Sequence, residues 1–427
     1  MIRRQVAVTV LAGVKRGRVE ALQVLLKEMG TDAAGNDVIP FGLLTTTHFA
    51  RLLLLDEVED PRGGKLPAKL MYLSDVDEPV QHHLDELVEH SGAGLDRVFG
   101  NCEGYPGGRG APSPARRLAW LGEHMVGAGA AYVNTVGRTL EQVLGEDSLR
   151  RAIGDFLDDP PAQWSDYDPD EVRAAIQDFV NTREDLDWAQ RPAAGPSWDD
   201  RARQLQGLVG LPIGVLALAP VIAVGLPLWL VGLLAQELTD DAAQIPPTDA
   251  HARELAELED RVTQNQFSAV GFLKPGKLRR LTAGTALRLV DYGARNVFNR
   301  GQLTGVKTIH FARWVYLDDH RRLIFASNYD GSLESYMDDF IDKVAWGLNA
   351  VFSNGVGYPR TIGLVFGGAH REQEFKDYLR RHQLPTQVWY SAYPQLTAVN
   401  IENNARIRAG LYGEMSRAET ESWLARI

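Results

Sequence analysis

Two stretches of the chain carry the same pair of side chains suited to acid–base chemistry. Residues 45–56 read TTTHFARLLLLD and residues 307–319 read KTIHFARWVYLDD, so His48 with Arg51 and His310 with Arg313 recur in one pattern. A carboxylate beside an imidazole fixes its tautomer, and one beside a guanidinium forms paired hydrogen bonds. The chemistry therefore depends on which carboxylates lie next to these residues.

The segments that follow the two stretches are also related. Residues 70–106 and 323–359 align without a gap and end in NCEGYP and NGVGYP. Such self-similarity indicates a diverged duplication, which has to be recognised before a fold is assigned. In an antiparallel hairpin the residue numbers of facing partners have a constant sum, which gives the register of each copy. The predicted neighbours are His48 and Asp77, Arg51 and Ser74, His310 and Asp330, and Arg313 and Ser327.

Each copy reads as strand, helix, strand, strand, helix and a last layer, the order of a βαββαβ ferredoxin-like unit. We predict an α+β fold in which two such repeats pack as a pseudo-dimer, with a helical linker and an apolar, membrane-associated hairpin inserted between them. The first copy differs in its tail, where residues 132–157 are predicted to be helical without a final strand. The expected parts are an N-terminal repeat with this helical tail (1–157), a linker (158–203), an apolar segment (204–236) and a C-terminal repeat (237–427).

The apolar segment contains no charged residue and exceeds the roughly 20 residues that a membrane span requires. Pro212, Pro220 and Pro227 are predicted to cut it into short helical arms. A single span would also separate the two copies, so we expect a re-entrant or surface hairpin with both copies on the cytoplasmic side. A helical insert buried in a soluble body is the alternative.

The bulk composition limits the function. The 427 residues carry a net charge of −11, which argues against a nucleic-acid partner, and the single Cys102 fits a reducing compartment. The N-terminus alternates like a strand, so no signal peptide is expected. The basic stretch LKPGKLRR (273–280) is suited to anionic lipid headgroups.

The repeated residues have two interpretations. A catalytic group is needed once, whereas a structural network is needed in every copy, so repetition favours a structural role. Residues found in one copy only are more informative, and they predict an apolar ligand pocket with a few polar groups, with an aromatic core as the alternative. The pocket candidates are Asn328, Tyr329, Trp314 and Tyr316. The helix segment QHHLDELVEH (81–90) is expected to be a solvated acidic face, and no metal site is expected.

Two ferredoxin-like units in one chain resemble the dimeric α+β-barrel superfamily, which includes dye-decolourising peroxidases and chlorite-dismutase-like proteins. Those peroxidases use a Gly-x-x-Asp-Gly loop, and residues 327–331 read SNYDG, which keeps Asp-Gly but lacks the first glycine. The resemblance implies Asp330 as the catalytic acid–base group and Arg313 as the stabiliser of developing charge. It further implies a heme ligand among His310, His370 and His382.

Two functions follow as hypotheses. The first is a membrane-associated, peroxidase-like oxidoreductase that uses heme and acts on a hydrophobic small molecule or a membrane lipid. The second is a non-catalytic, membrane-associated module that binds lipid or a protein partner, or serves as a scaffold. Assembly into a homo-oligomer is compatible with both.

Overall fold

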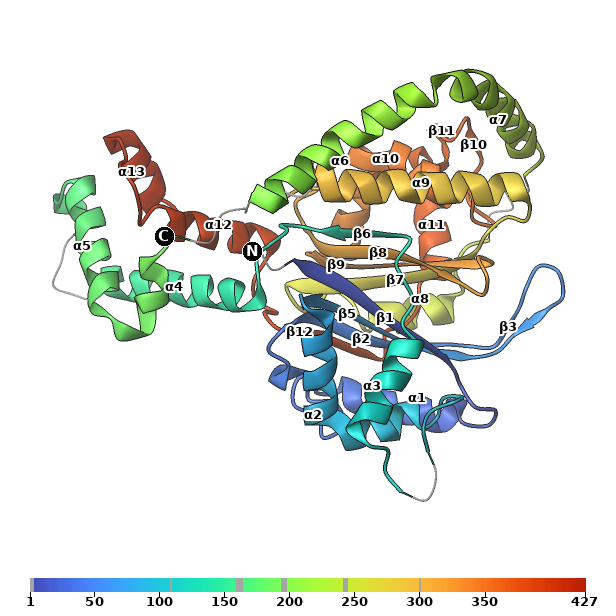
Figure 1. Cartoon of the computed structure of the whole chain (residues 1–427), viewed down its shortest axis with the longest axis horizontal. Coiled ribbons are helices and arrows are strands. Elements are labelled where there is room, and N and C mark those ends of the chain that lie inside the picture. The colour runs from blue at the N-terminus through green and yellow to red at the C-terminus, as the bar shows by residue number, and fades with distance from the viewer. Residues whose placement is uncertain (1–3, 108–109, 159–163, 193–197, 241–244, 299–300) are drawn as a thin grey trace.

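The computed structural model describes the chain except for residues 1–3, 108–109, 159–163, 193–197, 241–244 and 299–300. The fold is mixed α and β, and its centre consists of two four-stranded antiparallel sheets (Figure 1). The first sheet has the order β1 (Gln5–Gly13), β5 (Lys69–Asp77), β2 (Thr47–Leu55) and β12 (Val388–Ser391). The second has the order β6 (Ala130–Val133), β8 (Ile309–Leu317), β9 (Arg322–Asp330) and β7 (Gln264–Phe272).

Each sheet takes its fourth strand from the other half of the chain. β12 pairs with β2, and β6 pairs with β8, both antiparallel. The prediction of a helical tail from residue 132 was therefore wrong at its start, because Ala130–Val133 is a strand and the helix α4 begins only at Leu140 and ends at Asp158. A strand of four residues has too little periodicity to be recognised, and its partner lies in the other repeat.

The two sheets face each other across an apolar layer. Leu53 and Leu73 of the first sheet pack with Val315 and Ile324 of the second, and all four are almost fully buried. Alternation along each strand directs the other face of each sheet outward, where helices cover it. The first sheet is covered by α1 (Val19–Gly30), α2 (Val80–Phe99) and α3 (Pro114–Glu123), and the second by α9 (Lys277–Asn296), α10 (Leu333–Phe352) and α11 (Glu372–His382).

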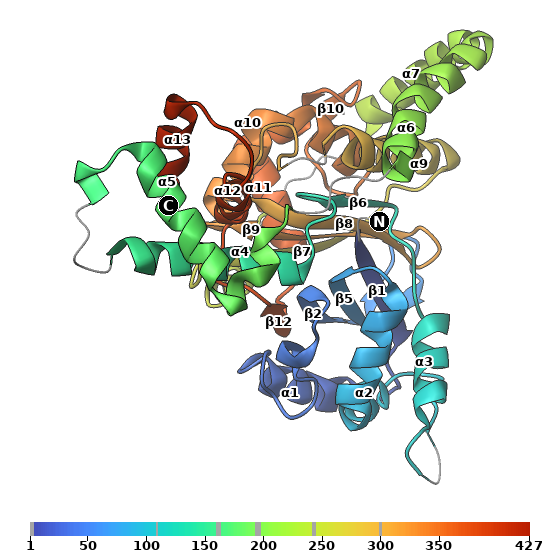
Figure 2. The ribbon, with the colours of Figure 1, turned by 60° about the vertical axis from the view of Figure 1, so that its left-hand side comes forward.

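A separate helical cluster lies at one end of the sheets (Figures 1 and 2). It consists of α4, α5 (Pro169–Thr182), the 3-10 helix η3 (Glu184–Gln190), α12 (Ala398–Ala409) and α13 (Arg417–Leu424). The segment predicted as a helical linker (158–203) contains α5 and η3 in its described central part, and both pack into this cluster. Asp168 caps α5 in a capping box, and Val172, Ile176 and Val180 form its buried stripe.

The apolar region forms the helices α6 (Trp198–Ala217) and α7 (Ala219–Thr239), which meet at Leu218. Pro212 and Pro227 lie inside these helices, so the prediction that every proline ends an arm was wrong; the break precedes Pro220 alone. The remaining elements are α8 (Asp249–Ala256), the short strands β3 (Val58–Glu59), β4 (Lys65–Leu66), β10 (Thr361–Ile362) and β11 (Phe366–Gly367), and the 3-10 helices η1 (Phe41–Leu43), η2 (Trp164–Asp166) and η4 (Gly368–His370).

Candidate functional site

Both repeated histidines lie at β-bulges. The pairing of β2 with β5 shifts between Thr47 and Phe49, and that of β8 with β9 shifts between Ile309 and Phe311, so each histidine is the extra residue. The predicted His–Asp neighbours are nevertheless correct. The distance from Nε2 to the carboxylate Oδ1 is 3.1 Å for His48 and Asp77, and 2.7 Å for His310 and Asp330. The predicted arginine neighbours are wrong by one position, because the register used to place them was one residue off: Arg51 faces Leu73 and Arg313 faces Ala326.

The second oxygen of each carboxylate caps a helix. The backbone N–H of Leu140 donates to Asp77 Oδ2 at 2.8 Å, and that of Ala398 donates to Asp330 Oδ2 at 2.7 Å. These amides belong to the first turns of α4 and α12, where N–H groups have no partner within the helix. Each aspartate therefore ties a bulged strand to a helix of the end cluster, which explains why the motif is needed in both copies.

A small cavity lies between the two histidines. His48 and His310 line it together with Tyr393 and Arg138, and its volume is about 30 Å³. The hydroxyl of Tyr393 is 2.9 Å from His48 Nδ1, so these two groups at the cavity wall are already hydrogen-bonded to each other. Such a volume holds about one or two waters and is far below the roughly 300–1,000 Å³ of a typical ligand pocket.

The two repeated arginines lie buried between the sheets. Arg313 Nη1 donates to the carbonyl oxygen of Val8 at 2.6 Å, and its Nη2 forms an ion pair with Asp75. Arg51, from the first sheet, makes the matching contacts with the second sheet. There it donates to the side-chain oxygen of Asn328, which takes the place that Asp75 has beside Arg313. Burial lowers the pKa of Arg51 to about 9, against the opposing effect of Asp75. Arg313 thus joins the sheets and does not share partners with the His310–Asp330 pair.

Three of the four pocket candidates belong to or pack against one hydrophobic core, and only Asn328 lies outside it. Trp314 and Tyr329 are buried in the core of the C-terminal half, where Tyr329 stacks on Tyr336 with ring centroids 4.0 Å apart. Asn328 belongs to the arginine network, and the ring of the half-buried Tyr316 lies tilted against that of His320. This arrangement matches the aromatic-core alternative.

The candidate heme ligands do not converge on a site that heme would fit. His370 is exposed on η4, and His382 donates from Nδ1 to the backbone carbonyl oxygen of Tyr378 at 2.7 Å. Burial lowers the pKa of His382 below its ordinary range. The cavity beside it measures about 20 Å³ and that beside His310 about 30 Å³. Within the described residues, neither space accommodates a porphyrin.

The acidic face predicted for α2 is partly buried. Glu86 is only 7% exposed and accepts a 3.0 Å hydrogen bond from the hydroxyl of Thr46, at the entry to β2. His83 is fully buried between Thr47 and Tyr72, and burial lowers its pKa to about 4. The prediction of a solvated face is therefore wrong for Glu86, which holds the start of the bulged strand.

The strongest surface feature is the apolar α6–α7 segment. In both views it projects from the body beside α9 (Figures 1 and 2). α7 is long and apolar enough to cross a membrane. Its most apolar stretch of 18 residues has a mean hydropathy of 1.8, and only 11% of that stretch is buried. The alternative of a buried insert is therefore wrong. The large apolar residues exposed along the whole α6–α7 segment are Leu205, Leu208, Val209, Ile213, Leu216, Leu218, Val221, Val224, Leu226, Leu228, Leu230, Val231, Leu234 and Leu238.

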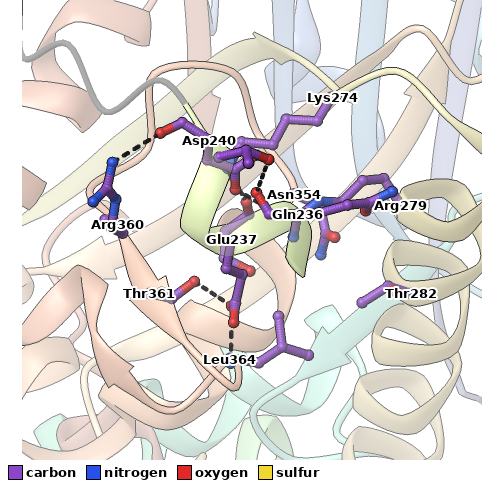
Figure 3. Close-up of polar contacts among 12 residues, drawn as sticks. Gln236, Glu237, Asp240, Lys274, Arg279, Thr282, Asn354, Arg360, Thr361 and Leu364 are labelled. Carbon is purple, nitrogen blue, oxygen red and sulfur yellow. Dashed lines mark hydrogen bonds and ion pairs between the residues drawn. The ribbon is translucent and has the colours of Figure 1, made fainter. Parts of the chain in front are cut away.

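The end of α7 is bonded to the body through Glu237. Its carboxylate accepts hydrogen bonds from the Thr361 hydroxyl at 2.6 Å, the Gly363 amide at 2.6 Å and the Leu364 amide at 3.0 Å (Figure 3). Further up the helix, Trp229 Nε1 donates to Thr282 of α9 at 3.0 Å. The last part of α7 is thus fixed, and the part before Trp229 is the part that projects.

Asp240, directly after α7, forms a second polar anchor. One of its carboxylate oxygens pairs with Arg279, which is 2% exposed, and with Lys274 Nζ at 2.7 Å (Figure 3). Burial lowers the pKa of Lys274, and Asp240 opposes that shift. The sequence suggested that LKPGKLRR meets lipid headgroups. Two of its cations, Lys274 and Arg279, instead pair with Asp240, while Arg280 is exposed.

Sequence reasoning overlooked both Glu237 and Asp240 as residues that anchor the apolar segment. The available signal in the sequence was a lone Glu at the end of an apolar run, followed by Asp240 and later by the four cations of LKPGKLRR (273–280). Compared with known proteins, the chain matches no family model, no curated protein and no solved structure.

Proposed function

We propose that this protein is a membrane-associated module that binds lipid through the α6–α7 segment and presents its two-sheet body at the membrane surface. One observation carries the proposal: a segment with many exposed large apolar residues is joined to the body by buried, charged anchors. Soluble monomers rarely expose apolar patches beyond a few hundred Å², and such patches mark membrane or protein contacts.

The strand exchange supports a location of both halves on one side of the bilayer. β6 and β12 each complete the sheet of the other half, so the halves cannot be separated by a membrane. α7 residues before Trp229 extend about 15 Å at 1.5 Å per residue, half of the roughly 30 Å hydrocarbon core. A re-entrant insertion into one leaflet fits these lengths better than a span.

At the level of the fold, we propose that the two halves are ferredoxin-like units, each of which adds one strand to the edge of the other half's sheet, beside β2 or β8. Each half supplies strand, helix, two paired strands and a second helix in the order of that unit. The exchange makes the halves mutually dependent, which suits a single rigid platform at the membrane.

The oxidoreductase function remains a prediction from the family resemblance. It is tested separately by titrating the purified protein with heme and recording the absorption spectrum. A Soret band shifted by a protein ligand, and lost in His310→Ala or His382→Ala, would support it. Unchanged spectra of free heme count against it.

The membrane proposal is tested by flotation with vesicles that contain anionic lipid. The full chain is compared with a variant in which residues 208–228 are replaced by a Gly-Ser linker, which retains Trp229, Glu237 and Asp240. The full chain should float with the vesicles and the variant should stay in the dense fraction. The variant should also remain folded, with an unchanged near-ultraviolet circular dichroism spectrum. Flotation of both proteins, or of neither, contradicts the proposal.

A further inference from the structure

The β10–β11 turn exposes a second, smaller apolar tip next to α7. Ile362, Val365 and Phe366 are exposed, Phe366 to 69% of its surface. In both ribbon views this turn lies on the same side of the sheets as the α6–α7 segment (Figures 1 and 2). A short turn that presents three large apolar side chains to water has no packing reason within the described chain.

The turn is rigid because the protein supplies partners for its backbone. Besides the three bonds from the turn to Glu237 of α7, the fully buried Asn349 donates to the carbonyl oxygens of Val365 at 2.9 Å and Gly367 at 3.0 Å. Leu364 is held at a φ of 61°, a left-handed conformation that a leucine rarely adopts. Backbone groups that enter lipid need internal partners, and this turn brings several with it.

A cation lies at the base of the turn. Arg360 is exposed and donates from Nη2 to the backbone oxygen of Asp240 at 3.3 Å, between the turn and the end of α7 (Figure 3). An apolar tip above an arginine is the order expected at a bilayer, where the rings and aliphatic groups enter the acyl region and the cation meets lipid phosphate.

We infer that the β10–β11 turn is a second membrane-inserting element, which enters the same leaflet as the α6–α7 segment and fixes the orientation of the body on the membrane. This inference rests on the proposed function. With one insertion the body could rotate about the α6–α7 axis. With two insertions joined through Glu237, one face of the sheet pair is directed at the lipid.

The inference is tested with fluorescent labels at single cysteines. Cys102 is fully buried, and burial raises the pKa of its thiol to about 12, so it does not compete for a maleimide dye. The full chain is labelled with an environment-sensitive dye after Phe366→Cys, Leu216→Cys or, as a control on α1, Val24→Cys. Each protein is mixed with anionic vesicles that contain lipids carrying a quencher in the acyl chain.

We expect quenching and a blue-shifted emission at positions 366 and 216, and neither at position 24. Quenching at 216 alone overturns the inference and leaves the proposed function intact. Absence of quenching at both positions overturns the two together. In the unlabelled protein, Phe366→Asp should weaken vesicle binding by roughly tenfold, the effect of withdrawing much of one phenyl ring from lipid. Val24→Asp should leave the affinity unchanged, and equal affinities of the two variants would contradict the inference.

Discussion

A charge placed in the apolar segment should separate membrane binding from folding. Leu216, near the end of α6, is 76% exposed, so an aspartate there loses almost no packing in the water-soluble fold. We expect the free energy of unfolding of Leu216→Asp to stay within about 0.5 kcal/mol of the parent, as for other surface substitutions. The same change in lipid is costly, because a carboxylate replaces an aliphatic side chain.

The size of the membrane effect follows from insertion energies. A leucine contributes about −0.5 kcal/mol and an aspartate costs about 3 kcal/mol near the centre of an inserted helix. The difference of about 3.5 kcal/mol corresponds to more than a hundredfold loss of affinity for vesicles. A matched control is Leu43→Asp on η1, where the leucine is 55% exposed in the N-terminal half. That control should bind vesicles like the parent.

The assay is a titration of each protein with vesicles, followed by flotation and quantification of the bound fraction. Urea unfolding of the same samples reports the free energy of unfolding. Equal vesicle affinities for Leu216→Asp and Leu43→Asp would refute the assignment of α6–α7 as the lipid-binding element. A loss of stability in Leu216→Asp alone would show instead that the segment packs against something in solution.

Three further predictions concern the polar network. Asp240→Asn should lower the free energy of unfolding by about 2–4 kcal/mol in urea titrations, because Arg279 is left buried without its carboxylate; an effect like that of an exposed aspartate would contradict the anchor. Asp330→Ala should cost about 2–3 kcal/mol and Asp330→Asn less, because the amide still accepts the helix-capping bond; equal losses would contradict capping. His83 is kept neutral by burial, so its contribution to stability is complete above its unfolded pKa near 6.5 and is lost as the pH falls toward its folded pKa of about 4. Between pH 6.5 and 5 the parent should lose about 1.5 kcal/mol more than His83→Gln, and parallel pH profiles would contradict this.

Local pattern predicted the order of the elements in each copy. Strand, helix, strand, strand and helix are present as β1, α1, β2, β5 and α2, and again as β7, α9, β8, β9 and α10, and the duplication placed His48 beside Asp77 and His310 beside Asp330. These features depend on periodicity and on antiparallel pairing between neighbouring strands. Both are encoded within a few tens of residues.

The sequence by itself determined the duplication, the paired His and Asp residues and the presence of an apolar segment without charge. Only the tertiary structure decided how these parts are used. The exchange of β6 and β12, the bulges at both histidines and the bonds from Glu237 to the β10–β11 turn all join residues far apart in the chain. Contacts of this kind depend on which surfaces meet after the sheets have formed, and a local pattern of residue types does not specify them.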